Sequence, residues 1–324
     1  MLYEDIIIMN EKCKWLYRYI KSCIQCKGLK KVMPFEKFRE YRIKYFSKYV
    51  GRSYDVQQAN EQLKKWIEEG RPFAVTRNGM AETVYFASLI KDSFWGTSTY
   101  KKHMALKGYF NNKAEIQEYK RIIEDCYENS DIVCAWYVLV MEEYQLHELA
   151  QKAIITRTRL VDEYDYPGCW IQSLEGKRVL VVSPFIETMQ EQYKKRKQLH
   201  RLINTLPDFT LLTVKSVWWY SDGKDQRFKS WNEVLEYLYD ECMKEKFDIA
   251  LLSCGTFSTP LAVKLKKAGK QAVQMGGALQ LLFGIKGKRW DDKGIYNEYW
   301  VRLPDSTKLG NVDVLDHTQG GIYW

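Results

Sequence analysis

A basic and an acidic side chain, Arg77 and Glu82, lie five positions apart with Gly79 between them. A guanidinium pairs with phosphate through fixed N–H donors, and a carboxylate can accept a proton, bind a metal ion or hold a sugar hydroxyl. Residues 72–76 read as a short strand and residues 81–90 as a helix, so the pair is expected at a tight turn between them. The alternative is an ordinary surface ion pair or an acid in the first turn of a helix.

A second candidate site lies between an apolar stretch, 248–252, and a helical pattern, 260–268. The connecting segment offers backbone amides, hydroxyl groups and the positive end of a helix dipole, which together suit a diphosphate. It matches neither a Walker loop nor GxGxxG, and Ser or Thr before a helix also serves as an ordinary N-cap. The candidate ligand-binding residues here are Gly255, Thr256, Ser258 and Thr259.

Further candidates follow other predicted elements. Gly276 and Gly277 come after the apolar stretch 271–274, where the lack of a side chain would let a ligand approach the backbone, although glycines also serve ordinary turns. Ser183 ends another predicted strand, and Lys288 and Arg289 follow an apolar segment and are expected to face the same cleft.

Aromatic side chains at Trp218, Trp219 and Tyr220 would stack against a sugar, or would simply belong to the core. The basic run 194–197 reads as a solvated helix face. The sequence has no serine-hydrolase elbow, zinc ligand set or DxD pair, and its four histidines are scattered.

The elements that position these residues alternate regularly in the second half of the chain. Short apolar strands alternate with helices, which predicts parallel βαβ units and an α/β fold with a Rossmann-like, mostly parallel sheet flanked by helices. The predicted strands are 179–182, 210–214, 248–252 and 271–274, and the predicted helices are 186–203, 231–244 and 260–268. Ligands in such sheets bind outside the carboxyl ends of the strands, where all the candidates lie.

The first half reads as mainly helical up to a boundary at 166–168. A helix is predicted over 56–69, ending at Gly70, and a buried strand over 131–139. Residues 91–130, between the predicted helix 81–90 and this strand, read as mainly helical and polar.

Length and composition set outer limits. The chain has 324 residues, enough for one large domain or two small ones. Its longest unbroken apolar run, 132–141, is too short to cross a bilayer, and no cationic segment precedes the first apolar stretch, so we expect a cytoplasmic protein. The eight cysteines show no regular spacing and are expected to be reduced, with Cys23 and Cys26 packing on a helix rather than binding zinc.

The net charge of +9 comes mostly from residues 1–50, which hold twelve basic and five acidic side chains. Apolar residues such as Trp15, Tyr19 and Ile20 recur there at helical spacing, and Gly28 is expected to end this helix. A basic amphipathic helix of this kind would rest on an anionic membrane surface, or would pack against the main domain with a solvated lysine face. No nucleic-acid motif accompanies the charge, so a nucleic-acid partner is not expected.

Taken together, these segments resemble a known family. The stretch 73–82 resembles the RxGxxE segment of the bacterial GT-D glycosyltransferases, and 176–196 is similar to a "GKkVLVihPF..ti..QY.kR" stretch in a polysaccharide-associated branch of these proteins. Residues 248–290, 297–302 and 320–324 are similar as well. The resemblance covers roughly residues 70–324, which suggests a helical extension over 1–60 and a glycosyltransferase domain over 61–324.

The resemblance implies an enzyme that takes a sugar from a nucleotide donor, typically a uridine diphosphate sugar, and gives it to a glycan or lipid-linked acceptor. It implies that Arg77, Gly79 and Glu82 form the donor-site motif. Metal-using members have Asp where this chain has Met80 and His where it has Gly277. We therefore expect no required cofactor, or only weak Mn²⁺ or Mg²⁺ binding. The alternative is a protein of the same fold that binds a nucleotide or glycan without catalysis.

Overall fold

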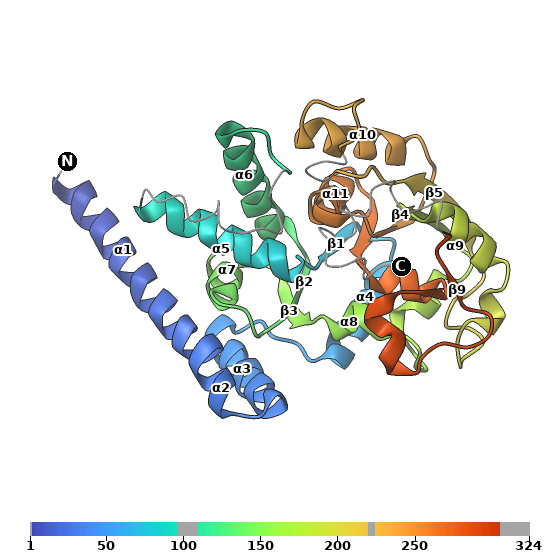
Figure 1. Ribbon diagram of the computed structural model, residues 1–324, viewed down its shortest axis with the longest axis horizontal. Coiled ribbons are helices and arrows are strands. Elements are labelled where there is room, and N and C mark those ends of the chain that lie inside the picture. The colour runs from blue at the N-terminus through green and yellow to red at the C-terminus, as the bar shows by residue number, and fades with distance from the viewer. Residues whose placement is uncertain (1, 96–108, 220–223, 305–324) are drawn as a thin grey trace.

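The computed structural model describes residues 2–95, 109–219 and 224–304 (Figure 1). Two sequence-based candidates lie outside these residues: Tyr220, and the similarity over 320–324. Part of the predicted helical segment 91–130 also lies outside them.

Seven parallel strands form one continuous sheet in the order β3-β2-β1-β7-β6-β4-β5. This confirms the predicted α/β fold with a parallel sheet. The strands are β1 (Phe73–Thr76), β2 (Ile132–Ala135), β3 (Ile154–Arg157), β4 (Arg178–Ser183), β5 (Thr210–Lys215), β6 (Ile249–Leu252) and β7 (Gln271–Gln274). A short parallel pair, β8 (Ile285–Lys286) and β9 (Val301–Arg302), lies apart from this sheet.

Helices cover both faces of the sheet, which is why the central strands β1, β7 and β6 are buried at every position. Successive side chains enter opposite cores: Ala74 packs in one, and Phe73 and Val75 in the other. The principal helices of the domain are α4 (Val56–Glu68), α5 (Met80–Trp95), α6 (Lys113–Asn129), α7 (Glu142–Glu148), α8 (Arg159–Asp162), α9 (Ile186–Tyr193), α10 (Trp231–Met243), α11 (Ser258–Lys267) and α12 (Ala278–Leu282). Short 3-10 turns occur at η4 (Trp170–Leu174), η5 (Arg196–Gln198), η6 (Gly255–Phe257) and η7 (Lys288–Lys293).

The central pairing for the site is that of β1 with β7. Val75 lies opposite Val273 in the parallel register, although almost 200 positions separate them in the chain. Because both strands run in the same direction, the turn after β1 and the glycines after β7 emerge at the same edge of the sheet.

The first half is mainly helical, as predicted, and it also contributes β1, β2 and β3 to the same sheet as the second half. Two other sequence-based predictions about local structure are wrong. The predicted helix 186–203 ends at Tyr193 and continues only as the short turn η5. The predicted strand 131–139 ends at Ala135, because the chain then turns through left-handed conformations at Tyr137 (φ 67°) and Met141 (φ 65°).

The N-terminal segment is a helical hairpin. Its first arm, α1 (Leu2–Cys23), continues through the π-helical η1 (Ile24–Leu29) into α2 (Lys30–Val32), and its second arm is α3 (Phe35–Val50). Figure 1 shows α1 projecting from the body of the molecule. The first arm does not end at Gly28 as predicted; it ends just before Pro34, whose ring prevents a further helical turn.

One side of this hairpin packs on the domain. Trp15, Phe46 and Val50 belong to the same core as the helices that cover one face of the sheet. Residue 60, where the sequence suggested a domain boundary, lies inside α4. Among the described helices there is none with an apolar stretch of the length needed to span a membrane.

Candidate functional site

A cavity of about 420 Å³ lies at the carboxyl edge of the sheet, where the turns after β1, β4, β5, β6 and β7 meet. Nine of the twelve candidate catalytic and ligand-binding residues line it: Arg77, Gly79, Glu82, Gly255, Thr256, Ser258, Gly276, Gly277 and Arg289. The structure thus brings the Arg-Gly-Glu turn of the first half together with the glycine turns of the second half.

Arg77 is fixed from several sides. Its backbone N–H donates to Oε1 of Gln274 at the end of β7 (2.9 Å), its guanidinium lies over the ring of Trp136 (4.6 Å to the centroid), and Nη2 lies 3.4 Å from Oδ1 of Asp162. Within the described residues its buried Nε has no hydrogen-bond partner. The side chain is 13% exposed, so it offers a positioned donor and an only partly neutralised charge at the cavity wall.

Gly276 and Gly277 lie directly against cationic side chains. Gly276 has φ +56°, and a Cβ added there would lie 2.7 Å from Nη1 of Arg77. A Cβ at Gly277 would lie 3.2 to 3.3 Å from the side chains of Arg289 and Trp290. The two glycines therefore leave room for two guanidinium groups at the same edge of the cavity.

Glu82 lies in the first turn of α5, and its carboxylate folds back over the turn that precedes it. A Cβ at Gly79 would lie 2.0 Å from Oε2 of Glu82, so only glycine allows this position. Burial raises the pKa of Glu82, while a hydrogen bond from its own backbone amide and the charge of Arg77 act in the opposite direction. A carboxylate with a raised pKa is a stronger base, which suits it to accept a proton from a substrate.

The hydroxyl groups proposed to bind ligand all have internal contacts. The Thr256 hydroxyl accepts from Nε1 of Trp231 (3.0 Å), and the Ser258 hydroxyl accepts from the backbone N–H of Cys254 (2.9 Å). The Thr259 hydroxyl lies 2.6 Å from Oε1 of Gln274 and does not line the cavity. These contacts hold the turn between β6 and α11. In the same turn, burial raises the pKa of Cys254 to about 12, so its thiol stays protonated near neutral pH.

Two of the proposed residues lie away from the cavity. Ser183 is fully buried, and its hydroxyl accepts from the backbone N–H of Phe185 (3.2 Å). Lys288 is exposed at the start of η7 and is not among the lining residues, whereas its neighbour Arg289 is.

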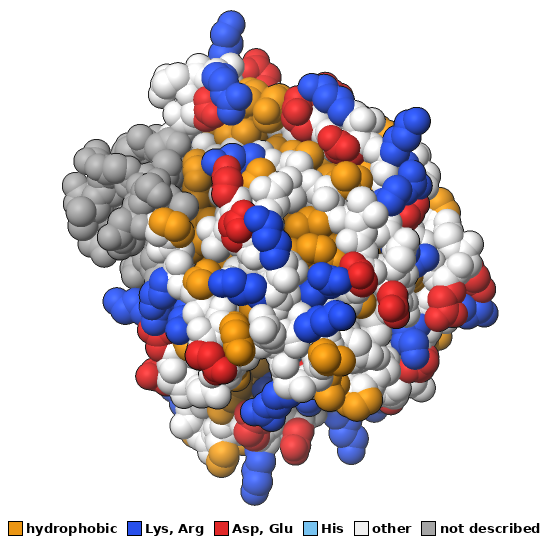
Figure 2. Space-filling view, turned by 90° about the vertical axis from the view of Figure 1, so that its right-hand side faces the viewer, with side chains coloured by type: hydrophobic (Ala, Val, Ile, Leu, Met, Phe, Trp, Pro, Cys, Tyr) orange, Lys and Arg blue, Asp and Glu red, His pale blue; other side chains and the backbone are white. Residues whose placement is uncertain are grey.

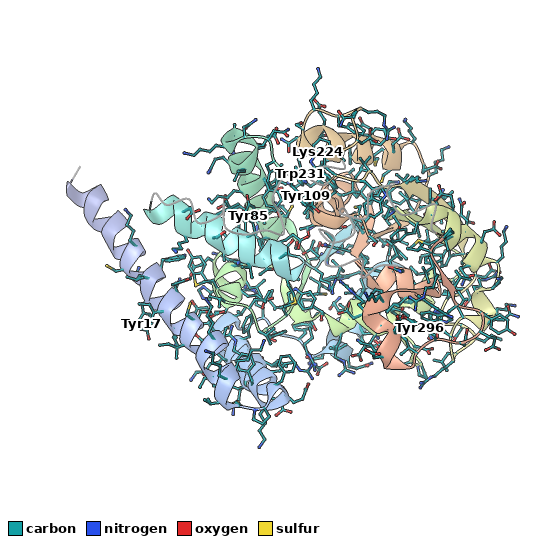
Figure 3. All side chains as sticks on the ribbon, in the orientation of Figure 1. Tyr17, Tyr85, Tyr109, Lys224, Trp231 and Tyr296 are labelled. Atoms are coloured by element: carbon teal, nitrogen blue, oxygen red, sulfur yellow. The ribbon has the colours of Figure 1, made fainter. Side chains whose placement is uncertain are left out.

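An aromatic wall completes the cavity, and sequence reasoning recognised only part of it. Trp218 and Trp219 after β5, proposed as sugar-stacking or core residues, both line the cavity, and Nε1 of Trp219 donates to the backbone oxygen of Tyr109 (2.8 Å). Tyr109 itself lies beside α10 on the upper side of the molecule in Figure 3. Phe185 and Trp136 were missed; Trp136 was placed inside a strand that ends one residue earlier.

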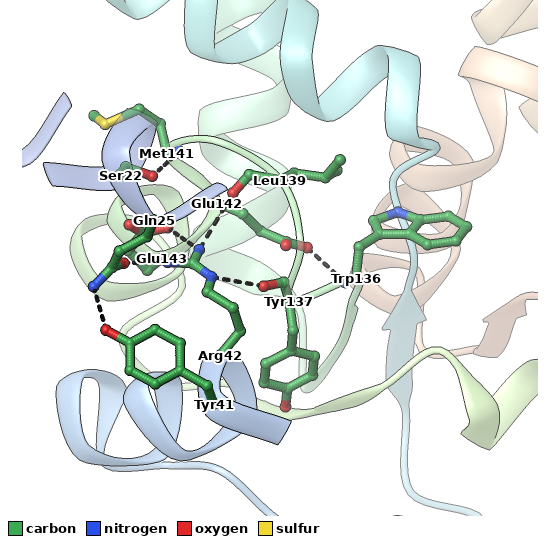
Figure 4. Close-up of polar contacts among 10 residues, drawn as sticks. All are labelled: Ser22, Gln25, Tyr41, Arg42, Trp136, Tyr137, Leu139, Met141, Glu142 and Glu143. Carbon is green, nitrogen blue, oxygen red and sulfur yellow. Dashed lines mark hydrogen bonds and ion pairs between the residues drawn. The ribbon is translucent and has the colours of Figure 1, made fainter. Parts of the chain in front are cut away.

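The loop that carries Trp136 is held by the N-terminal hairpin (Figure 4). The buried Arg42 of α3 donates through Nε to the backbone oxygen of Tyr137 (2.8 Å) and through Nη2 to Oε2 of Glu143 (2.8 Å). Ser22 of α1 accepts from the backbone N–H of Met141 (2.8 Å). Left-handed backbone at two non-glycine residues costs free energy, and contacts of this kind offset it.

Trp136 has two further contacts of its own. Its backbone N–H donates to Oε1 of Glu142 (2.7 Å), and its Nε1 donates to the backbone oxygen of Asn78 in the turn after β1 (2.9 Å). Glu142 and Asn78 thus fix the ring on which Arg77 rests. Arg42 and Ser22, which lie outside the resembling segment 70–324, help to shape the cavity by holding the loop that carries this ring.

The donor set of the cavity does not suit a divalent cation. Met80 offers a thioether and Gly277 no side chain, whereas Mn²⁺ and Mg²⁺ prefer several oxygen ligands. Glu82 and Asp162 are the acids near Arg77, and among the described residues no group of three His, Cys, Asp or Glu side chains is placed to hold a metal ion.

No protein-family profile matches the chain, and no curated protein matches it. Two solved structures of a domain of unknown function, DUF1792, are similar to it, with TM-scores of 0.44 and 0.45 at 13% identity. Each comparison covers 80% of this chain and 87% of the other. One is a selenomethionine-substituted structure, and the other is described as having a distinct glycosyltransferase fold. At this level of similarity a common fold is not established, and the functional assignment depends on the cavity.

Proposed function

We propose that the protein is a glycosyltransferase of the GT-D type that moves a sugar from a nucleotide-sugar donor, a uridine diphosphate sugar, to a glycan or lipid-linked acceptor. The observation that carries this proposal is the meeting of Arg77 and Glu82 with Gly255, Gly276 and Gly277 around one cavity. A cavity of about 420 Å³ is within the usual size of small-molecule sites.

In the proposed reaction the acceptor hydroxyl oxygen bonds to the anomeric carbon of the donor sugar. The bond from that carbon to the diphosphate oxygen breaks, and its electron pair leaves with the nucleoside diphosphate. Glu82 accepts the proton that the acceptor hydroxyl loses, which its raised pKa favours. Arg77 stabilises the charge on the leaving diphosphate, because its guanidinium is already oriented before the reaction.

Arg289 is positioned to assist Arg77, since both guanidinium groups lie beside the paired glycines after β7. Two cations at the edge of the cavity would supply the charge stabilisation that a metal ion gives in other transferases. We therefore propose metal-independent transfer, which an assay in EDTA tests: strict dependence on Mn²⁺ would overturn it. We further propose that the enzyme acts in bacterial surface polysaccharide synthesis at the cytoplasmic side of the membrane.

The proposal is tested in two steps. A thermal-shift screen of nucleotide sugars first identifies those that bind, and the release of nucleotide from each of these is then measured. Glu82→Gln is expected to lower turnover by at least a hundredfold while the protein stays folded, with an unfolding temperature no lower than that of the wild type, because a buried carboxyl with a raised pKa does not stabilise the fold in its charged form. Glu191→Gln, an exposed acid in α9, is the matched control and should retain full turnover. Near-wild-type turnover in Glu82→Gln would remove this residue from the mechanism.

The second candidate is a nucleotide- or glycan-binding protein without catalysis, which the replacement of two metal-ligand positions by Met80 and Gly277 favours. Calorimetry separates the two. Binding of a nucleotide sugar with no release of nucleotide, with or without an acceptor glycan, would favour the binding protein.

A further inference from the structure

The outer side of the first helical arm is apolar although nothing in the described structure covers it. Tyr17 is 66% exposed, Ile24 61% and Ile20 50%, and Leu16 lies on the same side. With about 3.6 residues per turn, positions 13, 16, 17, 20 and 24 form one stripe. Figure 3 shows Tyr17 projecting from α1 away from the body of the molecule.

The opposite side of the same arm is used for packing. Trp15 is 2% exposed and Ser22 is fully buried, and both face the domain. The helix therefore already has the apolar face that it needs for folding, and the outer stripe is a second, separate one. A helix that serves only as a packed extension would present polar residues there.

Positive charge surrounds this stripe. Residues 13–35 contain five Lys, one Arg and no Asp or Glu, and Arg18 pairs with Glu148 of the domain. Lys14 and Lys21 lie along one edge of the stripe by helical position, and Lys27, Lys30 and Lys31 are exposed at its end beside the exposed Val32 and Phe35. The side of the molecule turned to the viewer in Figure 2 differs, because basic and acidic side chains alternate there.

We propose that this outer face of residues 13–35 docks on the surface of an anionic lipid bilayer. Apolar side chains would enter the boundary between headgroups and acyl chains, and the lysines would contact lipid phosphates, as in interfacial amphipathic helices. Self-association through this face is disfavoured, because two copies would bring like-charged lysines, Lys14, Lys27, Lys30 and Lys31, against one another. The inference rests on the surface alone and does not require the proposed transferase activity, although it would bring the cavity near lipid-linked acceptors.

Vesicle flotation tests the proposal with the full chain. Vesicles of phosphatidylcholine with one third phosphatidylglycerol should bind the protein, and pure phosphatidylcholine should bind it at least tenfold more weakly. Binding to the anionic vesicles should fall as salt is raised. Lys27→Gln, Lys30→Gln and Lys31→Gln together should weaken it by about fivefold per lysine. The matched control replaces three exposed lysines with Gln at the end of α9, on the opposite side of the molecule from α1: Lys194, Lys195 and Lys197. This variant should bind the vesicles as the wild type does.

The apolar part is tested by Ile20→Asp with Ile24→Asp, which should abolish flotation. The control is Ile203→Asp, a 66% exposed isoleucine outside the arm, which should not change it. Circular dichroism melting confirms that each variant is folded. Three outcomes would overturn the proposal: no preference for anionic vesicles, full binding by the Ile20/Ile24 variant, or a concentration-dependent oligomer in solution that this variant dissociates.

Discussion

The guanidinium of Arg77 rests on the indole of Trp136, 4.6 Å from its centroid, although the two residues follow different strands of the sheet. β1 and β2 are parallel neighbours, so the residues that follow them emerge side by side. The indole holds the arginine by a cation–π contact while Nε1 donates to the turn of Arg77 itself. Trp136 is thus a positioning residue for the cation that the proposed reaction needs.

Replacing Trp136 tests this role. Trp136→Ala is expected to weaken donor binding by about 5- to 30-fold, the range of a desolvated cation–π contact, whereas Trp136→Phe should keep most of the affinity because it preserves an aromatic face. Calorimetric Kd values for the donor measure the difference. Equal losses in both variants would mean that the indole acts through its hydrogen bond or its bulk instead.

Gly276→Ala tests the space beside Arg77. The new methyl group would lie 2.7 Å from Nη1, so the guanidinium must move, and the donor's kcat/KM should fall by at least tenfold. Gly294→Ala is the matched control, because Gly294 also has positive φ (+60°) but has nothing within 4 Å of an added Cβ. Both variants should lose about 1 kcal/mol of stability from backbone strain, and only the first should lose activity. Loss of activity in both would assign the effect to strain.

The ionisation of Glu82 predicts a pH dependence. Its pKa is raised by burial, so the acidic limb of kcat/KM should have its midpoint above the ordinary carboxyl value of 4.5, with activity rising as the proton is lost. The charge of Arg77 lowers this pKa, and Arg77→Gln should therefore move it further up. A titration of the glutamate carboxyl carbons by NMR follows the shift independently of turnover. A Glu82 pKa that falls in Arg77→Gln would contradict the geometry.

The sequence predicted the parallel sheet and most of the cavity for a specific reason. In such a sheet the residues after each strand share one edge, so the positions of Arg77, Gly255 and Gly276 follow from strand order without any knowledge of side-chain contacts. Trp136 could not be found in this way. Its place depends on where β2 ends, and that end is fixed by Arg42, about a hundred residues distant in the chain.

The hydroxyl residues illustrate the opposite error. Thr256 and Ser258 were proposed as ligand-binding residues because they precede a helix, and they do line the cavity. Their hydroxyl oxygens, however, accept hydrogen bonds from Trp231 and Cys254. The capping interpretation and the binding interpretation predict the same residue types at the same place, and only the positions of the donors separate them.

The last prediction concerns stability, through the acid that holds the Trp136 loop. Glu142 is 3% exposed, and burial raises its pKa to about 7, while the hydrogen bond from Trp136 and the charge of Arg42 only partly oppose this. Below pH 4.5 the carboxyl is protonated in both the folded and the unfolded chain. Between pH 4.5 and 7 the folded chain keeps a proton that the unfolded chain has lost, so this contribution to stability falls as pH rises.

Glu142→Gln removes this titration, and its amide oxygen can still accept from the Trp136 N–H. The variant should match the wild type in free energy of unfolding near pH 4.5 and exceed it by up to about 3 kcal/mol at pH 8, because one pKa unit corresponds to about 1.4 kcal/mol. Urea denaturation of both proteins across this pH range measures the difference. A difference that does not change with pH would show that Glu142 is already charged in the folded protein, stabilised by Arg42 more strongly than burial opposes it.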